Sequence, residues 1–367
     1  MSQPYVLYGG EISYYSGKVR AYLRHKGIAF DERPATREVY RQVILPRVGW
    51  PVIPVVITPD DVTLQDTSDI IDALELRHPQ PSVYPSGPRQ RLAGLLLEVY
   101  GDEWLKIPAM HYRWNHNTDW IIREFGRLSR PELPEAAQFE VGERACRPFR
   151  GSLPALGVTA ATIPAIEASY ETLLGELDVH FAEHAYLFGD RPSIGDFGLI
   201  GPLYAHQFRD PASGALMERL APHVVAWVRR MLDPEPADGD FLADDALPET
   251  LLPILRRMVT EQFPVLQATE RAFAAWNASH PEEDIPRAIG MHRFTLGTAS
   301  DVEATAERAI FPFDLWMFQR PRDFLEGLEG VDRASAGDLL RSIGGLELVS
   351  KPPAIRLARR AFRLVRA

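Results

Sequence analysis

Apolar and polar residues along the first 75 positions follow two different spacings, which predicts strands and helices in succession. The apolar run 5–8 (Tyr-Val-Leu-Tyr) is typical of a buried strand and is followed by Gly9 and Gly10. Within 16–26 the apolar residues recur at i, i+3 and i+4, which is one face of a helix, and Gly27 suits its end. This opening therefore predicts a strand, a polar corner and a helix.

The segments that follow extend this pattern to residue 75. Residues 28–30, 52–57 and 62–64 are apolar or β-branched, as in strands, and turn residues separate the last two. The Asp-Thr-Ser-Asp sequence at 66–69 is favoured at helix starts, and apolar residues at helical spacing come after it. The predicted order is βαβ followed by ββα.

A proline-rich segment, 78–88, separates this α/β region from a helical one. Its four prolines exclude a helix, so we predict a linker. The spacing then becomes helical in 92–106, 119–128 and 166–185, whereas 131–164 is looser. Ser193 followed by Asp196 is close to a capping box, with the Ser hydroxyl accepting a backbone N–H and the Asp carboxylate accepting the Ser N–H.

The C-terminal third is also predicted to be mainly helical. We expect helices at 251–263, 265–278, 304–311 and 335–343, with one short strand at 293–296. The tail 351–366 has six basic residues and no acidic one, and we interpret it as a basic helix.

The order of these elements resembles the N-terminal domain of glutathione transferases. That order is a strand, a polar corner and a helix, then Ile-Pro before a strand, and then an acid-hydroxyl pair at a helix start. The segment 186–200 is similar to the N-capping motif of their helical domain. The resemblance implies an α/β thioredoxin-like glutathione-binding domain at 1–78, a linker at 79–90, an all-α domain at 91–240 and an extra helical extension at 241–367. It also implies a homodimer with the site between the two domains.

The sequence resembles the serine-type members of this family, and that resemblance implies which residues form the glutathione site. Ser13 stands at the position of the activating hydroxyl, before Lys18-Val-Arg20. Ile53-Pro54 resembles the Val-Pro element, so a cis peptide bond and backbone pairing of Ile53 with glutathione are expected. Asp66 and Thr67 resemble the Glu-Ser pair, so that Asp66 faces the γ-glutamyl ammonium and Thr67 the carboxylate.

Other hydroxyl groups near this corner are alternatives for the catalytic role. Tyr14 stands where the family usually has proline, and Ser16 occupies the position of the second cysteine of thioredoxins; we include both among the glutathione-binding residues. Tyr8 and Tyr15 could also donate. The corner has no cysteine, which argues against a thioltransferase that forms a mixed disulfide with glutathione.

The chemistry of such a site explains why a hydroxyl is needed beside the sulfur. A free thiol has a pKa of about 8.5, and each unit of lowering takes about 1.4 kcal/mol of interaction with the thiolate. One hydrogen bond to a charged acceptor supplies about 1.5–3 kcal/mol, or about one to two pKa units. A neighbouring helix N-terminus adds positive potential.

Aromatic residues gather in the region that forms the electrophile pocket in the family. Trp104, His111 and Tyr112 are our candidates, and aromatic side chains suit an apolar substrate. His111 and His116 are five residues apart and so not on one helix face. With no third ligand in view, we expect no metal.

Composition narrows the partners and the location. The chain has 367 residues and a net charge of −10, which disfavours binding to nucleic acid or anionic membranes. Neither a signal peptide nor a run of 18 apolar residues is evident, so we expect a cytoplasmic protein. The expected function is attack of glutathione thiolate on a small apolar electrophile, as in detoxification. A glutathione-dependent isomerase or lyase, and a non-catalytic binding protein, remain alternatives.

Overall fold

The computed structural model describes residues 4–234 and 239–367. Two segments lie outside the described residues: positions 1–3, which begin the stretch in which no signal peptide is evident, and positions 235–238. The chain forms two compact units that alternate along the sequence. Among described residues, unit 1 comprises 4–83, 109–152 and 199–234, and unit 2 comprises 84–108, 153–198 and 239–367. The four domain segments expected from the sequence stay a prediction.

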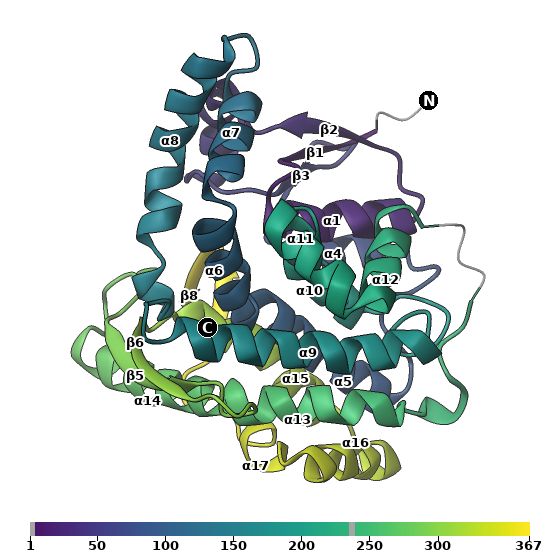
Figure 1. The fold of residues 1–367 in the computed structure, drawn as a ribbon. Helices are drawn as coiled ribbons and strands as arrows, with labels where there is room; N and C mark the ends of the chain where they lie inside the picture. Colours follow the sequence, from purple (N-terminus) through teal and green to yellow (C-terminus); the bar gives the residue numbers. More distant parts are fainter. Residues whose placement is uncertain (1–3, 235–238) are drawn as a thin grey trace. The chain divides into compact units, whose positions relative to one another are not determined.

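Unit 1 contains a four-stranded mixed sheet. Its strands are β1 (Tyr5–Gly9), β2 (Phe30–Pro34), β3 (Val55–Ile57) and β4 (Thr63–Gln65), in the order β2-β1-β3-β4. Strand β1 is parallel to β2 and antiparallel to β3, and β3 is antiparallel to β4. Helices α1 (Tyr14–His25) and α4 (Thr67–Arg77) pack together beside this sheet (Figure 1). This is the thioredoxin-like arrangement expected from the sequence.

The predicted apolar faces account for the core of this region. Leu7 of β1 and Val56 of β3 are paired in register and fully buried. Val19, Tyr22 and Leu23, the predicted face of α1, are also fully buried. Removing such side chains from water stabilises the fold by about 1.5–3 kcal/mol each.

The rest of unit 1 is helical. Its further elements are α2 (Arg37–Val39), η1 (Tyr40–Ile44), α3 (Leu45–Val48), α7 (Thr118–Ser129), α8 (Glu135–Gly151), η4 (Leu203–Phe208), α11 (Pro211–Leu220), α12 (Pro222–Leu232), the part of α6 (Lys106–His116) after Pro108 and the part of α10 (Ile194–Pro202) after Gly198.

Helix α8 falls in the segment that the sequence analysis treated as loose. It packs lengthwise on α7 (Figure 1) because two glycines let the backbones approach. A Cβ on Gly126 would come within 2.0 Å of the Gln138 carbonyl oxygen, and one on Gly142 within 1.9 Å of that of Ile122. Backbone contact through glycine leaves little apolar periodicity, which is why α8 was missed.

Unit 2 is also mostly helical. Its elements are the N-terminal parts of α6 and α10, α5 (Pro88–Val99), η2 (Tyr100–Trp104), η3 (Pro154–Leu156), α9 (Ile163–Glu183), η5 (Ala243–Asp245), η6 (Glu249–Leu251), α13 (Leu252–Glu261), α14 (Phe263–Ser279), β5 (Met291–Leu296), β6 (Ala304–Ala309), α15 (Pro312–Glu326), α16 (Gly330–Ile343), α17 (Leu346–Val349), β7 (Leu357–Arg360) and β8 (Arg363–Arg366). Helices α9 and α13 run side by side (Figure 1).

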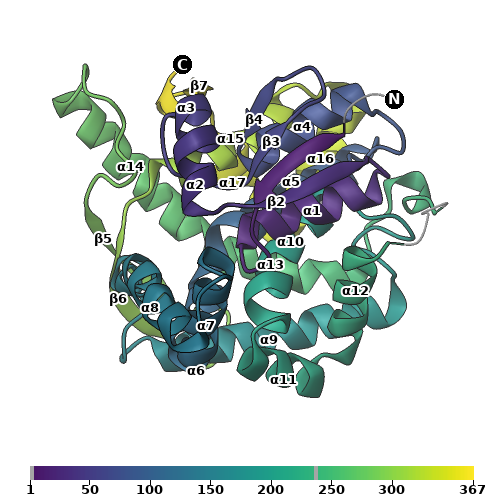
Figure 2. The same cartoon turned by 90° about the horizontal axis from the view of Figure 1, so that it is seen from above.

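The predicted helix at 304–311 is wrong, because this segment forms strand β6. It pairs with β5 in antiparallel register from Met291↔Ala309 to Leu296↔Ala304, and the hairpin follows α14 in the chain (Figure 2). The expected strand at 293–296 is confirmed within β5. Alanine, glutamate and arginine favour helices locally, but pairing with β5 overrides that preference.

The basic tail is not a helix either. Strands β7 and β8 form a hairpin whose turn residues, Ala361 and Phe362, have φ of 46° and 61°. A two-residue turn of this kind usually carries Asn-Gly or Asp-Gly. The sequence Ala-Phe carries no such turn signal, and for this reason the predicted basic helix at 351–366 is wrong.

The predicted capping motif at the start of α10 is present in unit 2. Asp196 Oδ2 accepts hydrogen bonds of 2.8 Å from both the N–H and the hydroxyl of Ser193, and its Oδ1 accepts the Leu187 N–H at 3.1 Å. The bond from the Asp carboxylate to the Ser N–H is confirmed. The Ser hydroxyl donates to that carboxylate, a bond that was not anticipated. Among the residues described, no helix is long and apolar enough to cross a membrane.

Candidate functional site

The corner between β1 and α1 presents Ser13 at the start of a 12-residue helix. Ser13 is the N-cap of α1, and its Oγ accepts the Ser16 N–H at 3.3 Å. Its own N–H donates to the carbonyl oxygen of Gly10 at 3.0 Å. The Ser13 side chain is half-buried. Its hydroxyl thus lies in the positive potential of a helix N-terminus.

Three of the alternative hydroxyl-bearing residues, Tyr8, Tyr14 and Ser16, are more deeply buried than Ser13, whereas Tyr15 is half-buried like Ser13. Ser16 is fully buried, and its Oγ accepts the Gly10 N–H at 3.3 Å. The Tyr14 ring is 6% exposed and meets the His206 ring edge-on, with centroids 5.4 Å apart. Burial, followed by the charge of Arg113, lowers the pKa of His206 well below its usual value, so this ring is neutral at pH 7. Tyr8 is buried as well.

A buried arginine from α1 supports the corner from one side. Arg20 Nε and Nη2 donate to the carboxylate of Glu32 at 2.7 and 2.5 Å, and Nη2 also donates to the Gly10 carbonyl oxygen at 3.1 Å. Burial lowers the pKa of Arg20, but the hydrogen bond and charge of Glu32 outweigh it and the pKa is raised. The sequence analysis noted Arg20 only as part of a motif, because its partner comes from β2.

A second buried arginine, Arg113 of α6, supports the corner from another element of unit 1. Its Nε and Nη2 donate to the Asp210 carboxylate at 2.7 and 2.8 Å, and its Nη1 donates to the Ile12 carbonyl oxygen at 2.7 Å. Burial lowers the pKa of Arg113 and raises that of Asp210, and the ion pair opposes both shifts. The sequence analysis missed this pair, although two charges within apolar helical segments are a usable signal.

The Ile53–Pro54 peptide bond is cis, as expected from the sequence. Pro54 is buried and Ile53 is half-buried. A Cβ on Gly10 would lie 4.0 Å from Ile53 Cδ1, so the Ile-Pro segment borders the corner that carries Ser13. The pairing of Ile53 with glutathione stays a prediction.

Asp66 and Thr67 begin helix α4. Asp66 is the N-cap, has φ 76° and ψ 139°, and accepts the Ser68 N–H at 3.0 Å through its carboxylate. Such a conformation is rarely adopted by residues other than glycine. Thr67 is buried, and the next residue, Ser68, accepts a bond of 3.5 Å from Lys18 Nζ of α1. The two helices that begin at Ser13 and Asp66 are therefore linked.

The three candidates for the electrophile pocket fall in different units. In unit 1, His111 and Tyr112 are buried and their ring centroids are 5.0 Å apart. The His111 and His116 rings, expected on different faces, lie 5.1 Å apart because His116 ends helix α6. The absence of a metal stays a prediction, as does the pocket itself.

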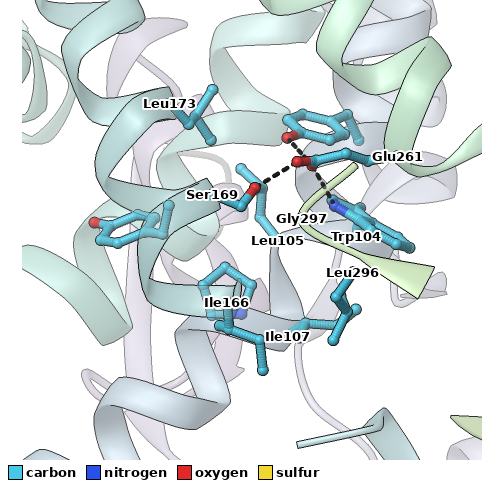
Figure 3. A pocket seen from close by; sticks show the side chains of 12 residues that line it. Trp104, Leu105, Ile107, Ile166, Ser169, Leu173, Glu261, Leu296 and Gly297 are labelled. Carbon is cyan, nitrogen blue, oxygen red and sulfur yellow. Dashed lines mark hydrogen bonds between the residues drawn. The ribbon is translucent and has the colours of Figure 1, made fainter. Parts of the chain in front are cut away.

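Trp104 belongs to unit 2, where it lines a small cavity (Figure 3). Its indole N–H donates to the buried Glu261 carboxylate at 3.1 Å, which also accepts the Ser169 hydroxyl. The cavity volume is about 20 Å³, which corresponds to about one water molecule. This cavity is too small for an organic substrate.

The single cysteine is placed for packing rather than chemistry. Cys146 of α8 is 2% exposed, and burial raises the pKa of its thiol to about 12, against the opposing charges of Arg113 and Arg150. We expect no reaction with an aromatic disulfide reagent at about pH 8 in the folded protein, and complete reaction in urea. Fast labelling of the folded protein in this titration would contradict the assignment.

The chain was compared with known proteins and solved structures. No curated protein matches the chain. Among solved structures, a glutathione S-transferase from Rhodospirillum rubrum F11 is 16% identical, with a TM-score of 0.41 over 67% of this chain and 96% of that one. One from Methylobacterium radiotolerans, in complex with glutathione sulfonate, is 20% identical, with a TM-score of 0.39 over 67% and 100%. The beta-etherase LigF from Sphingobium sp. strain SYK-6 is 18% identical, with a TM-score of 0.45 over 64% and 97%.

Family models match both regions that the sequence analysis singled out. The glutathione S-transferase N-terminal domain matches residues 7–82, which include Ser13, Ile53-Pro54 and Asp66-Thr67. The glutathione S-transferase C-terminal domain matches residues 160–230. Residues 7–82 and 160–230 of this chain thus match, in order, the two domains of the glutathione S-transferase family.

Proposed function

We propose that the protein is a glutathione transferase. In the proposed reaction the thiolate of bound glutathione attacks an electrophilic carbon of a small, mostly apolar compound. The sulfur–carbon bond forms as the bond from that carbon to the leaving group breaks, and the leaving group departs with the electron pair. The thiol proton passes to solvent before the attack. The family match over both domains supports this reaction class.

Ser13 is the proposed donor to the thiolate. Ser13 is the least buried residue among Ser13, Tyr14 and Ser16, and it lies at the N-terminus of α1. A hydroxyl hydrogen bond and the helix potential both favour the anion over the thiol. Ser16, which already accepts the Gly10 N–H inside the fold, is the second candidate.

Asp66 provides the observation that carries the proposal. A residue other than glycine at φ 76° and ψ 139° costs on the order of 1–3 kcal/mol, and such strain is concentrated at ligand sites. The Asp66 carboxylate is half-buried at the start of α4, where it can meet the γ-glutamyl ammonium. Thr67 and the first N–H groups of α4 are placed for the γ-glutamyl carboxylate.

Calorimetry with glutathione and ultraviolet absorbance of the bound thiolate test this proposal together. Binding with a thiolate signal at neutral pH is the expected result. Binding without that signal would favour a non-catalytic member, and no binding would exclude the proposal. Product analysis with an apolar halide then separates conjugation from isomerase or lyase chemistry. The homodimer and the role in detoxification stay predictions, of which light scattering tests the first.

Replacing Asp66 with asparagine separates glutathione binding from helix capping. Asparagine is as good an N-cap as aspartate, so the melting temperature should change little. Loss of the charged partner of the ammonium should weaken glutathione binding by about tenfold or more, since such bonds contribute about 1.5–3 kcal/mol. Calorimetry measures the affinity. An Asp60→Asn variant, which alters a carboxylate paired with Arg77, is the control and should bind normally.

A further inference from the structure

We propose that Arg113 is a positioning residue that orients the Ser13 hydroxyl toward the thiolate of glutathione. The inference rests on the proposed function and assigns a part in it to a side chain outside the predicted glutathione site. Arg113 acts through the backbone of Ile12, the residue before Ser13.

One peptide group joins Arg113 to Ser13. The Ile12 carbonyl and the Ser13 N–H belong to the same planar unit. Arg113 Nη1 donates to the carbonyl oxygen at 2.7 Å, while the N–H donates to the Gly10 carbonyl oxygen at 3.0 Å. Both ends of the plane are therefore held, and its orientation sets the direction in which the Ser13 side chain leaves the backbone.

The two groups that hold this plane are themselves fixed. Arg113 is 2% exposed, its guanidinium is bound in two places by Asp210, and Nη2 also donates to the carbonyl oxygen of Ala205 in η4. On the other side, the Gly10 carbonyl oxygen accepts from Arg20, which is paired with Glu32. The buried Arg113–Asp210 pair thus holds one end of the peptide that carries Ser13, and the Arg20–Glu32 pair, in which Glu32 is part-exposed, holds the Gly10 carbonyl at the other end.

Stability alone does not explain such an arrangement. Apolar residues of similar volume often give a core the same stability as a buried ion pair, because removing two charges from water is costly. An arginine in this place makes bonds in three directions from one rigid plane, to Asp210, Ile12 and Ala205. Lysine keeps the charge but cannot reproduce that geometry.

The consequence for chemistry is specific. A donor displaced by a fraction of an ångström stabilises the thiolate less, whereas the γ-glutamyl end, held at Asp66 and Thr67, is unaffected. Loosening Arg113 should therefore raise the pKa of bound glutathione and leave its affinity, measured for the thiol at low pH, nearly unchanged.

The test compares Arg113→Lys and Asp210→Glu in the full-length chain. Each keeps opposite charges in the buried pair and alters where the guanidinium or ammonium can reach. We expect the pKa of bound glutathione, from thiolate absorbance against pH, to rise by about one unit, a roughly tenfold loss of thiolate below that pKa. Should Arg113→Lys fail to fold, Asp210→Glu gives the same readout.

Arg257→Lys is the matched control. Arg257 is 3% exposed and donates to Glu176 at 2.7 and 2.8 Å, so it matches Arg113 in burial and pairing but belongs to unit 2. It should leave the pKa of bound glutathione unchanged. An equal rise in this variant would overturn the inference, because the effect would then follow from general loosening.

A double variant shows whether Arg113 acts through Ser13. In a Ser13→Ala background, Arg113→Lys should cause no further rise in the pKa, and an additive rise would overturn the inference. If wild type binds glutathione with a Ser13-dependent thiolate signal and Arg113→Lys does not shift it, the inference fails while the proposed function stands. If the thiolate signal of wild type persists unchanged in Ser13→Ala, the inference fails and the donor role passes to Ser16. If wild type binds glutathione with no thiolate signal at all, both the inference and the proposed function fail.

Discussion

Replacing Ser13 with alanine should raise the pKa of bound glutathione by about one to two units and lower turnover at pH 7 by about 10- to 100-fold. The hydroxyl that donates to the thiolate is lost, while the potential of the α1 N-terminus remains. Thiolate absorbance against pH gives the pKa, and steady-state kinetics give the turnover. Glutathione affinity, which we assign to Asp66 and Thr67, should change little.

Two further variants make this result specific. Ser13→Thr keeps a hydroxyl that can cap α1 and should retain most of the thiolate signal. Ser16→Ala removes the alternative hydroxyl, which accepts the Gly10 N–H. If Ser13→Ala leaves the pKa unchanged and Ser16→Ala raises it, the catalytic role belongs to Ser16. Ser13→Ala also loses an N-cap, so a fall in stability of about 1 kcal/mol accompanies the kinetic effect.

Replacing Asp314 with asparagine should destabilise unit 2 by about 3 kcal/mol. Asp314 is 2% exposed, and its carboxylate pairs with Lys106 Nζ at 3.3 Å and Arg308 Nη2 at 2.9 Å. Burial raises the pKa of Asp314, but the charges of Lys106 and Arg308 outweigh it and lower the pKa. Asparagine leaves the buried Arg308 and the half-buried Lys106 without that opposite charge. Glu103, which bonds to Lys106, compensates in part, which places the loss at the low end of the range for buried pairs.

Urea denaturation of wild type and variant, followed by fluorescence, measures this loss. The matched control is Asp338→Asn, whose partner Arg341 is on the same exposed helix surface. Exposed pairs contribute about 0.2–1 kcal/mol, so this variant should unfold almost as wild type does. Equal midpoints for the Asp314 and Asp338 variants would show that the Asp314 ion pairs contribute little.

The contribution of Asp314 to the free energy of unfolding is fully present above the pKa of this carboxyl in the unfolded chain. It is lost as the pH falls through the lower pKa of the folded protein.

Two candidate site positions could be recognised from the sequence as helix starts, because a helix start depends on neighbours in the chain. Ser13 and Asp66 are N-caps, and the capping preference and the apolar spacing that follows are local signals. The succession of strands and helices along this part of the chain follows from the same spacing. The sequence alone did not decide which hydroxyl serves the thiolate, because Ser13, Tyr14 and Ser16 lie within four positions. Their different burial in the fold supplies that ranking.

The sequence by itself determined the α/β region with its two helix starts, since caps, glycines and apolar spacing act over a few residues. Tertiary structure alone decided that 304–309 and 357–366 form hairpins, because strand pairing satisfies their backbone and overrides local preference. It also decided that Arg113 and Asp210, 97 positions apart, meet behind Ser13. A bond of that kind depends on how separate helices pack, and no pattern within either helix contains it.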